Sequence, residues 1–137
     1  MTMMMHESRG NPAIEAEAPV PRFSPAEARL AHARGSAVFV DLRMTREMER
    51  TGIIPGAFPC PHGLMDLWID PGSPSNDTAI ANEKVFVFCC SNGLHSSQAA
   101  RSARQIGLRQ AACLEGGMDA WLASGGGIAA LDQLQVH

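Results

Sequence analysis

The sequence contains no cluster of lysine or arginine and no basic stripe at helical spacing. Its formal net charge is −3 and its isoelectric point is near 5.9, so the positive surface of a nucleic-acid-binding protein is missing. No apolar run approaches the roughly 18–20 residues that cross a bilayer, which excludes a membrane-spanning helix. The first ten residues show no cationic segment followed by an apolar stretch. We therefore expect no secretory signal and a cytoplasmic protein.

The four cysteines, at positions 60, 89, 90 and 113, lack the spacing of metal-binding sites. No Cys-x-x-Cys pair and no cluster of histidine and cysteine is present, so no metal centre is predicted. Cys89 and Cys90 are adjacent, which makes them a poor pair for a disulfide, and thiols stay reduced in the cytoplasm. A reactive thiol is the possibility that remains.

What is present is typical of one compact domain. With 137 residues, 45% of them hydrophobic, the chain can bury a sizeable core but leaves little room for a second domain. We interpret residues 1–20 as a flexible arm, with an edge strand near residues 20–23 as an alternative for its end. Residues 21–126 are predicted to form the domain, and residues 127–137 a C-terminal tail or short helix.

Helix and strand signals alternate through the predicted domain. Ser24, Pro25 and Glu27 together predict a helix start, because they supply an N-cap, a proline at the first position and a capping box. Gly35 ends that helix. Continuous apolar residues in 37–43 and 85–90 predict strands that are buried on both faces. The other predicted elements are a helix at 45–50, a brief strand at 57–60, one or two helical turns at 62–70, a loop at 70–77, a helix at 96–106, a strand at 111–114 and a helix at 117–124.

This alternation predicts a three-layer α/β fold. Its central sheet is expected to be mostly parallel, with about five strands and with helices on both faces. In open sheets of this kind, ligands bind beyond the carboxyl ends of the strands, where a loop leads into the next helix. The best-defined strand ends at Cys90, so the loop that follows is the candidate site.

Cys90 combines a thiol with the start of a helix. Residues 91–95 join the strand to a helix beginning near Ser96, and the unpaired amides and dipole of a helix start favour an anion. A free cysteine titrates near ~8.5, and such a setting lowers the pKa to roughly 3.5–7.5. Gly93 allows successive amides to converge on the sulfur. The alternative is that Cys90 is a small buried residue with an inert thiol.

The remaining cysteines are interpreted mainly as packing residues. Side chains alternate along a strand, so Cys89 points into a layer between sheet and helix if Cys90 faces the loop. Cys113 lies inside the last predicted strand and is interpreted in the same way. Cys60 follows a brief strand and is near enough in the predicted order to approach the site, but we expect a structural role.

Four segments, in order, resemble the rhodanese-like family over about residues 22–126. Asp41-Leu-Arg43 is similar to the family's Asp-x-Arg, and Gly52-Ile-Ile-Pro-Gly-Ala57 is similar to its Gly-His-Ile-Pro-Gly-Ala turn. Cys90-Ser-Asn-Gly-Leu-His-Ser96 resembles the active-site loop Cys-x-x-Gly-x-Arg-Ser. Gly116-Gly-Met-Asp-Ala-Trp121 resembles the closing Gly-Gly-x-x-x-Trp. Each motif alone is weak, and their common order and spacing carry the resemblance.

The resemblance implies a sulfurtransferase with Cys90 as the nucleophile. Cys90 would take the outer sulfur of thiosulfate or of a persulfide donor, hold it as a cysteine persulfide and pass it to cyanide or a thiol. A sulfur-carrier protein or a thioredoxin-like protein is a further expected acceptor. The main-chain amides of the loop would stabilise the thiolate and the persulfide. These loop residues are Ser91, Asn92, Gly93, Leu94, His95 and Ser96. No metal or organic cofactor is needed.

His95 stands where the family loop usually has arginine. Arginine is always charged and grips an oxyanion through two parallel hydrogen bonds, whereas histidine titrates near ~6.5 and offers one donor per nitrogen. We therefore expect weak thiosulfate binding that improves as the pH falls toward about 6. The alternative is that His95 only fills space at the loop tip.

Residues around the predicted site receive structural interpretations first. Asp41 and Arg43 are expected to form a pair that fixes a loop, with direct substrate contact as the alternative. Trp121 is expected to cap the core. His62 and Trp68 fall in the segment that walls the pocket in related domains, so both are candidate pocket residues, with surface packing as the alternative.

Two other functions remain open from the sequence. One is a cysteine phosphatase or arsenate reductase, whose loop has the form Cys-x5-Arg. Counting from Cys89 gives Cys-x5-His, which lacks the arginine that clamps the dianion. The other is a non-catalytic binding or redox-sensing module that keeps the fold.

Overall fold

The computed structural model describes residues 19–64, 66–67 and 72–131. It confirms the predicted α/β fold: five strands form one sheet in the order β1-β5-β4-β2-β3, and every pairing between them is parallel. The strands are β1 (Arg22–Phe23), β2 (Ala37–Asp41), β3 (Phe58–Pro59), β4 (Val85–Cys89) and β5 (Ala111–Leu114). Within the described ranges, no helix is both long enough and apolar enough to cross a membrane.

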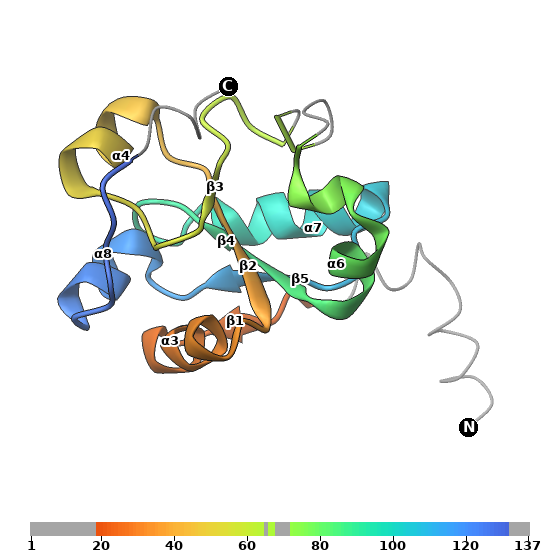
Figure 1. The fold of residues 1–137 in the computed structure, drawn as a ribbon, viewed down its shortest axis with the longest axis horizontal. Helices are drawn as coiled ribbons and strands as arrows, with labels where there is room; N and C mark the ends of the chain where they lie inside the picture. The colour runs from red at the N-terminus through yellow and green to blue at the C-terminus, as the bar shows by residue number, and fades with distance from the viewer. Residues whose placement is uncertain (1–18, 65, 68–71, 132–137) are drawn as a thin grey trace.

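Helices cover both faces of this sheet, and Figure 1 shows α3 and α7 on opposite sides of the strands. Consecutive residues of a buried strand point to opposite faces. Phe39 of β2 accordingly joins one core cluster, which receives side chains from α3, α4 and α8. Val40 joins a second cluster, which receives side chains from α6 and α7. The helices are α3 (Pro25–Arg34), α4 (Thr45–Thr51), α6 (Thr78–Glu83), α7 (Ser96–Ile106) and α8 (Gly117–Ala123).

The first helix begins where its local signals predict. The Ser24 hydroxyl accepts a hydrogen bond from the Glu27 amide at 3.1 Å, and the Ser24 amide donates to the Glu27 carboxylate at 2.9 Å. Pro25 occupies the first helical position, and Gly35 ends the helix with a φ of 67°, in the left-handed region. The predicted capping box is confirmed.

The register of the central strands brings the two predicted site segments together. Asp41 at the end of β2 lies beside Cys89 at the end of β4. The pairing continues one residue further, because the Leu42 amide donates to the Cys89 carbonyl at 2.8 Å. Residues that follow β2 and β4 therefore emerge at the same edge of the sheet.

Two elements differ from the sequence prediction in the segment before β4. Residues 70–77 were predicted as a loop, but Pro74–Asn76 forms a short 3₁₀ helix (η1), and the unpredicted α6 follows it. The Asp77 carboxylate caps α6 by accepting from the Ile80 amide at 3.2 Å. Ile80 packs against the second core cluster. A helix of six residues is too short to show a clear apolar period, so the hydrophobic pattern of the sequence does not indicate it.

The ends of the predicted domain are described only in part. The arm up to residue 18, and residues 132–137, lie outside the described residues. So do positions 65 and 68–71 of the segment predicted to form helical turns. Residues 127–131 form no helix, and Ala129 instead forms an antiparallel bridge with Ile53, with both hydrogen bonds at 2.8 Å.

Candidate active site

Cys90 lies at the base of a cavity at the carboxyl edge of the sheet. The residue follows β4 directly, and its side chain belongs to the buried set, with 6% of the residue exposed. The cavity has a volume of about 350 Å³. Its walls come from the segment after β2, from α4 and from the loop between β4 and α7. They are formed by Leu42, Arg43, Met44, Glu47, Cys90, Ser91, Asn92 and His95.

The loop supplies hydrogen-bond donors to the Cys90 sulfur. The Gly93 amide donates to Cys90 Sγ at 3.1 Å. Burial by itself raises the pKa of the Cys90 thiol. The main-chain amide of His95, the hydroxyl and amide of Ser96 and the amide of Gly93 together outweigh it, so the pKa lies below that of an ordinary cysteine. This arrangement gives Cys90 a larger thiolate fraction than an ordinary cysteine has at the same pH.

The start of α8 packs against the loop that follows β4 and forms hydrogen bonds with it. The Met118 amide donates to the Cys90 carbonyl at 2.8 Å, and the Asp119 amide donates to the Ser91 carbonyl at 2.9 Å. The two chains approach so closely that a side chain at Gly117 would collide with the main chain of the loop. Gly93 has a φ of 87°, and an added Cβ there would lie 3.0 Å from the Gly116 nitrogen. Two glycine positions thus set the shape of the amide cradle.

The Asp41–Arg43 pair lies beside the cavity, and Arg43 forms part of its wall. Arg43 Nη2 lies 2.7 Å from the Asp41 carboxylate, and both residues are almost fully buried. The same guanidinium also donates to the Thr51 hydroxyl at 2.7 Å and to the Gly52 carbonyl at 2.9 Å. All three guanidinium nitrogens are therefore engaged with the protein. This geometry ties the end of β2 to the turn after α4 and leaves Arg43 poorly placed to clamp a substrate anion.

The sequence model of the rhodanese-like domain matches residues 24–124, which is well over half of the 137-residue chain. The chain belongs to the rhodanese-like family. A comparison with curated protein sequences found no match.

Solved structures with the same fold include proteins of different description. A protein of unknown function from Rhodopseudomonas palustris, described as a possible tyrosine phosphatase, is 42% identical, with a TM-score of 0.67 over 80% of this chain and 85% of that one. A rhodanese-like domain protein from Staphylococcus aureus is 23% identical, with a TM-score of 0.61 over 82% and 100% of the two chains. A single-domain sulfurtransferase from Saccharomyces cerevisiae is 19% identical, with a TM-score of 0.60 over 80% and 94%. The last two show the fold alone.

Within this rhodanese-like domain, the loop residues play different parts. The Leu94 amide donates to the Asn92 side chain at 3.0 Å, so this amide is not directed at the sulfur as the sequence suggested. The Leu94 side chain is 74% exposed. Ser96 is buried at the start of α7, whereas His95 is exposed and lines the cavity. The Cys90 cradle is therefore built by Gly93, His95 and Ser96 rather than by every amide of the loop.

The other three cysteines lie in the core, and all four are free thiols. Cys89 is 1% exposed and belongs to the first core cluster, on the face that carries α3 and α8. Burial raises the pKa of Cys89 well above the ordinary value, and it also raises that of Cys113. Cys60 is fully buried in the second cluster. These placements agree with packing roles for all three.

Glu47 is the site residue that sequence reasoning missed. Its carboxylate accepts a hydrogen bond from the Ser91 hydroxyl at 2.8 Å, although 44 positions separate the two residues. The one available signal was its place in a helix directly after a parallel strand, at the edge where ligands bind. Met44, which also lines the cavity, is 70% exposed and shares that signal.

His62, one of the two candidate pocket-wall residues, is not among the residues that line the cavity of Cys90. His62 instead lines a neighbouring cavity of about 640 Å³, together with Met44, Thr45, Arg46, Glu47, Arg50 and Pro61. Trp68 lies outside the described residues. Within the described ranges, no group of three or more histidine, cysteine, aspartate or glutamate side chains is placed to hold a metal ion.

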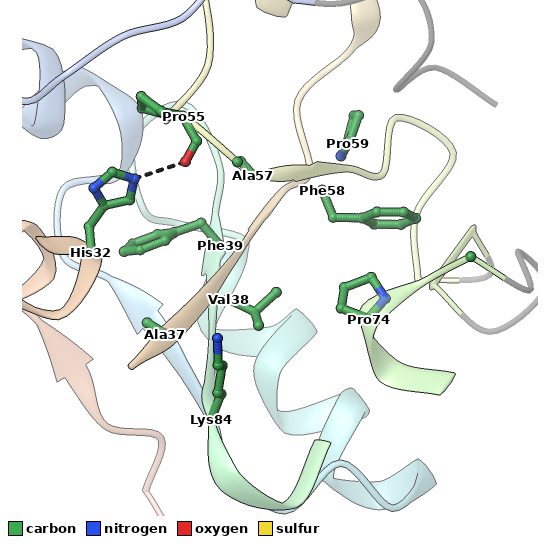
Figure 2. A pocket seen from close by; sticks show the side chains of 12 residues that line it. His32, Ala37, Val38, Phe39, Pro55, Ala57, Phe58, Pro59, Pro74 and Lys84 are labelled. Carbon is green, nitrogen blue, oxygen red and sulfur yellow. Dashed lines mark hydrogen bonds between the residues drawn. The ribbon is translucent and has the colours of Figure 1, made fainter. Parts of the chain in front are cut away.

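A further cavity, of about 460 Å³, lies toward the amino ends of β2 and β4 (Figure 2). Figure 2 shows Phe39 and His32 on one side of it and Phe58 and Pro74 on the other, with Lys84 reaching in from below. The His32 ring makes a 2.8 Å hydrogen bond with the Pro55 carbonyl. None of its lining residues is a cysteine or other strong nucleophile, so it is separate from the chemistry at Cys90.

Proposed function

We propose that this rhodanese-like protein is a sulfurtransferase that carries a sulfane sulfur on Cys90. One observation carries the proposal: a thiol with a lowered pKa sits at the base of a cavity, with a main-chain amide 3.1 Å from its sulfur. A thiolate is the nucleophilic form of cysteine. The amides that stabilise it are fixed before substrate arrives, because α8 and the two glycines hold the loop.

The proposed reaction has two displacements at sulfur. The Cys90 thiolate attacks the outer sulfur of thiosulfate or of a persulfide, the sulfur–sulfur bond of the donor breaks, and the electron pair leaves with sulfite or with the donor thiolate. The Cys90 persulfide that results keeps its negative charge within reach of the same amides. A thiolate or cyanide then attacks the outer sulfur and regenerates the Cys90 thiolate. A sulfur-carrier or thioredoxin-like protein is a proposed acceptor besides small thiols.

Intact-mass measurement tests this proposal directly. The protein is treated briefly with a sulfane sulfur donor, and the expected result is a gain of one sulfur atom that cyanide removes. The gain should disappear in Cys90→Ala and persist in Cys89→Ala, because Cys89 lies in the core. Absence of any gain in the unaltered protein, with every donor tried, would leave a non-catalytic or redox-sensing domain instead.

A phosphatase is the second candidate, because the Rhodopseudomonas palustris relative with 42% identity is described as a possible tyrosine phosphatase. The geometry of the cysteine loop favours a phosphatase less than a sulfurtransferase. A Cys-x5 loop would have to start at Cys89, whose thiol is buried and has a raised pKa. The one arginine among the described residues of the cavity wall is engaged by Asp41. Hydrolysis of p-nitrophenyl phosphate that is lost in Cys89→Ala would support this candidate over sulfur transfer.

A further inference from the structure

We infer that Glu47 makes the site select against dianionic donors such as thiosulfate, and that its donor is a low-molecular-mass persulfide whose anionic group lies away from the sulfane sulfur. The inference rests on the proposed sulfur transfer and names its donor class. It follows from the charges around two adjoining cavities.

The cavity of Cys90 carries a carboxylate and lacks a free arginine among its described residues. Glu47 lines it and is held there by the Ser91 hydroxyl, the side chain next to the nucleophile. Arg43 is neutralised by Asp41. His95 is the other basic residue of the wall, and it is at most singly charged. A donor that brings two negative charges next to its outer sulfur would meet like charge at this point.

Positively charged side chains line the cavity next to that of Cys90. The neighbouring cavity shares Met44 and Glu47 with that of Cys90, so the two adjoin along α4. Arg46 and Arg50 line this second cavity and are exposed. Neither makes a salt bridge or side-chain hydrogen bond with any residue that the structure describes. Two arginines therefore outnumber the single carboxylate and can receive an anionic group of a bound molecule.

A persulfide of an anionic thiol fits this separation of charge. Its outer sulfur carries a hydrogen when protonated and can approach Cys90 beside Glu47, while a carboxylate several bonds away reaches Arg46 and Arg50. In the transfer, a bond forms between Cys90 Sγ and the outer sulfur. The sulfur–sulfur bond of the donor breaks, and its electron pair leaves with the donor thiolate. The hydrogen stays on the transferred sulfur, so no oxidant or reductant is consumed.

The test compares three donors on the intact protein: glutathione persulfide, thiosulfate, and the persulfide of N-acetylcysteine methyl ester, which is called the uncharged persulfide below because it has no charged group besides the persulfide itself. Formation of the Cys90 persulfide is followed by rapid quenching and intact mass. Glutathione persulfide is expected to give the highest kcat/KM. Glu47→Gln keeps an acceptor for the Ser91 hydroxyl and is expected to raise kcat/KM for thiosulfate by about tenfold, with a much smaller effect on the uncharged persulfide. Glu49→Gln, an exposed residue of the same helix, is the matched control.

The arginine contribution is tested separately. The double variant Arg46→Gln/Arg50→Gln is expected to raise KM for glutathione persulfide by about threefold to tenfold and to leave the uncharged persulfide unaffected. Arg34→Gln, an exposed residue at the end of α3, is the control.

Three results would decide against the inference or its foundation. If kcat/KM for thiosulfate equals that for glutathione persulfide, and Glu47→Gln does not change the ratio of the two values, the role of Glu47 is overturned. If KM rises equally for both persulfides in the double arginine variant, the proposed contact between the donor's anionic group and the two arginines is overturned. No persulfide on Cys90 with any of the three donors overturns the proposed function itself, which is a distinguishable outcome because it does not depend on the donor.

Discussion

Gly117→Ala is the substitution whose effect on the Cys90 loop follows most directly from the structure. A Cβ at this position would collide with the Cys90 carbonyl oxygen, and would lie 2.7 Å from the Gly93 nitrogen and 2.8 Å from the Ser91 carbonyl carbon. All three are main-chain atoms, so no flexible side chain can move aside. The backbone at Gly117 also has a φ of 62°, in the left-handed region that alanine disfavours.

Two separate contributions give the magnitude of the destabilisation expected for Gly117→Ala. Left-handed backbone costs alanine about 1–2 kcal/mol. The collision adds to this by pushing the loop off α8, which weakens the hydrogen bonds from the Met118 and Asp119 amides. Two such bonds contribute about 1–3 kcal/mol together. Gly125→Ala supplies the matched control, because Gly125 has a φ of 80° but nothing within 4 Å of its added Cβ. The excess destabilisation of Gly117→Ala over Gly125→Ala is therefore about 1–3 kcal/mol.

Thermal unfolding and thiol reactivity measure the two consequences. For a domain of this size, the excess should lower Tm by roughly 3–9 °C beyond the control. The displaced loop should also lose part of its amide cradle, so the pKa of Cys90, measured from the rate of alkylation by iodoacetamide against pH, should rise toward that of an ordinary thiol. Equal Tm values for the two variants, together with an unchanged alkylation profile, would refute the claim that α8 shapes the loop.

Three further predictions concern charge at and beside the site. In the unaltered protein, alkylation of Cys90 should rise with pH and reach its plateau at a lower pH than for a free cysteine, because a lowered pKa leaves more thiolate at any given pH. Asp41→Asn should destabilise the fold by about 3–5 kcal/mol in urea unfolding, because it leaves the buried Arg43 guanidinium without its counter-charge. His95→Arg should raise kcat/KM for thiosulfate by roughly tenfold at neutral pH, because arginine is always charged and grips an oxyanion through two parallel hydrogen bonds.

Each of these has its own contrary result. Alkylation of Cys90 with the pH profile of a free cysteine would mean that the amides do not offset burial. A destabilisation by Asp41→Asn no larger than that by the exposed control Glu49→Gln would show that the buried pair contributes little. An unchanged rate for His95→Arg, at saturating and at limiting thiosulfate alike, would remove His95 from donor binding.

Much of the fold was predictable because its signals are local. The capping box of α3 involves residues three apart, and the apolar runs of β2 and β4 show burial on both faces directly. The candidate nucleophile was predictable for the same reason, since Cys90 stands between an apolar strand and a helix, with Gly93 three residues on. The short α6 was missed, because its packing against the second cluster leaves little trace in six residues.

The sequence by itself determined which thiol stands between a buried strand and the start of a helix, and which kind of sheet carries it. Only the tertiary structure decided what surrounds that sulfur: Glu47 reaches Ser91 from α4, and Gly117 brings α8 against the loop. Neither contact leaves a pattern along the chain, because both depend on the strand order that places β2 beside β4 and on the close approach of segments distant in sequence. Local geometry is encoded by neighbours, whereas the charge and rigidity of a site are set by packing between elements.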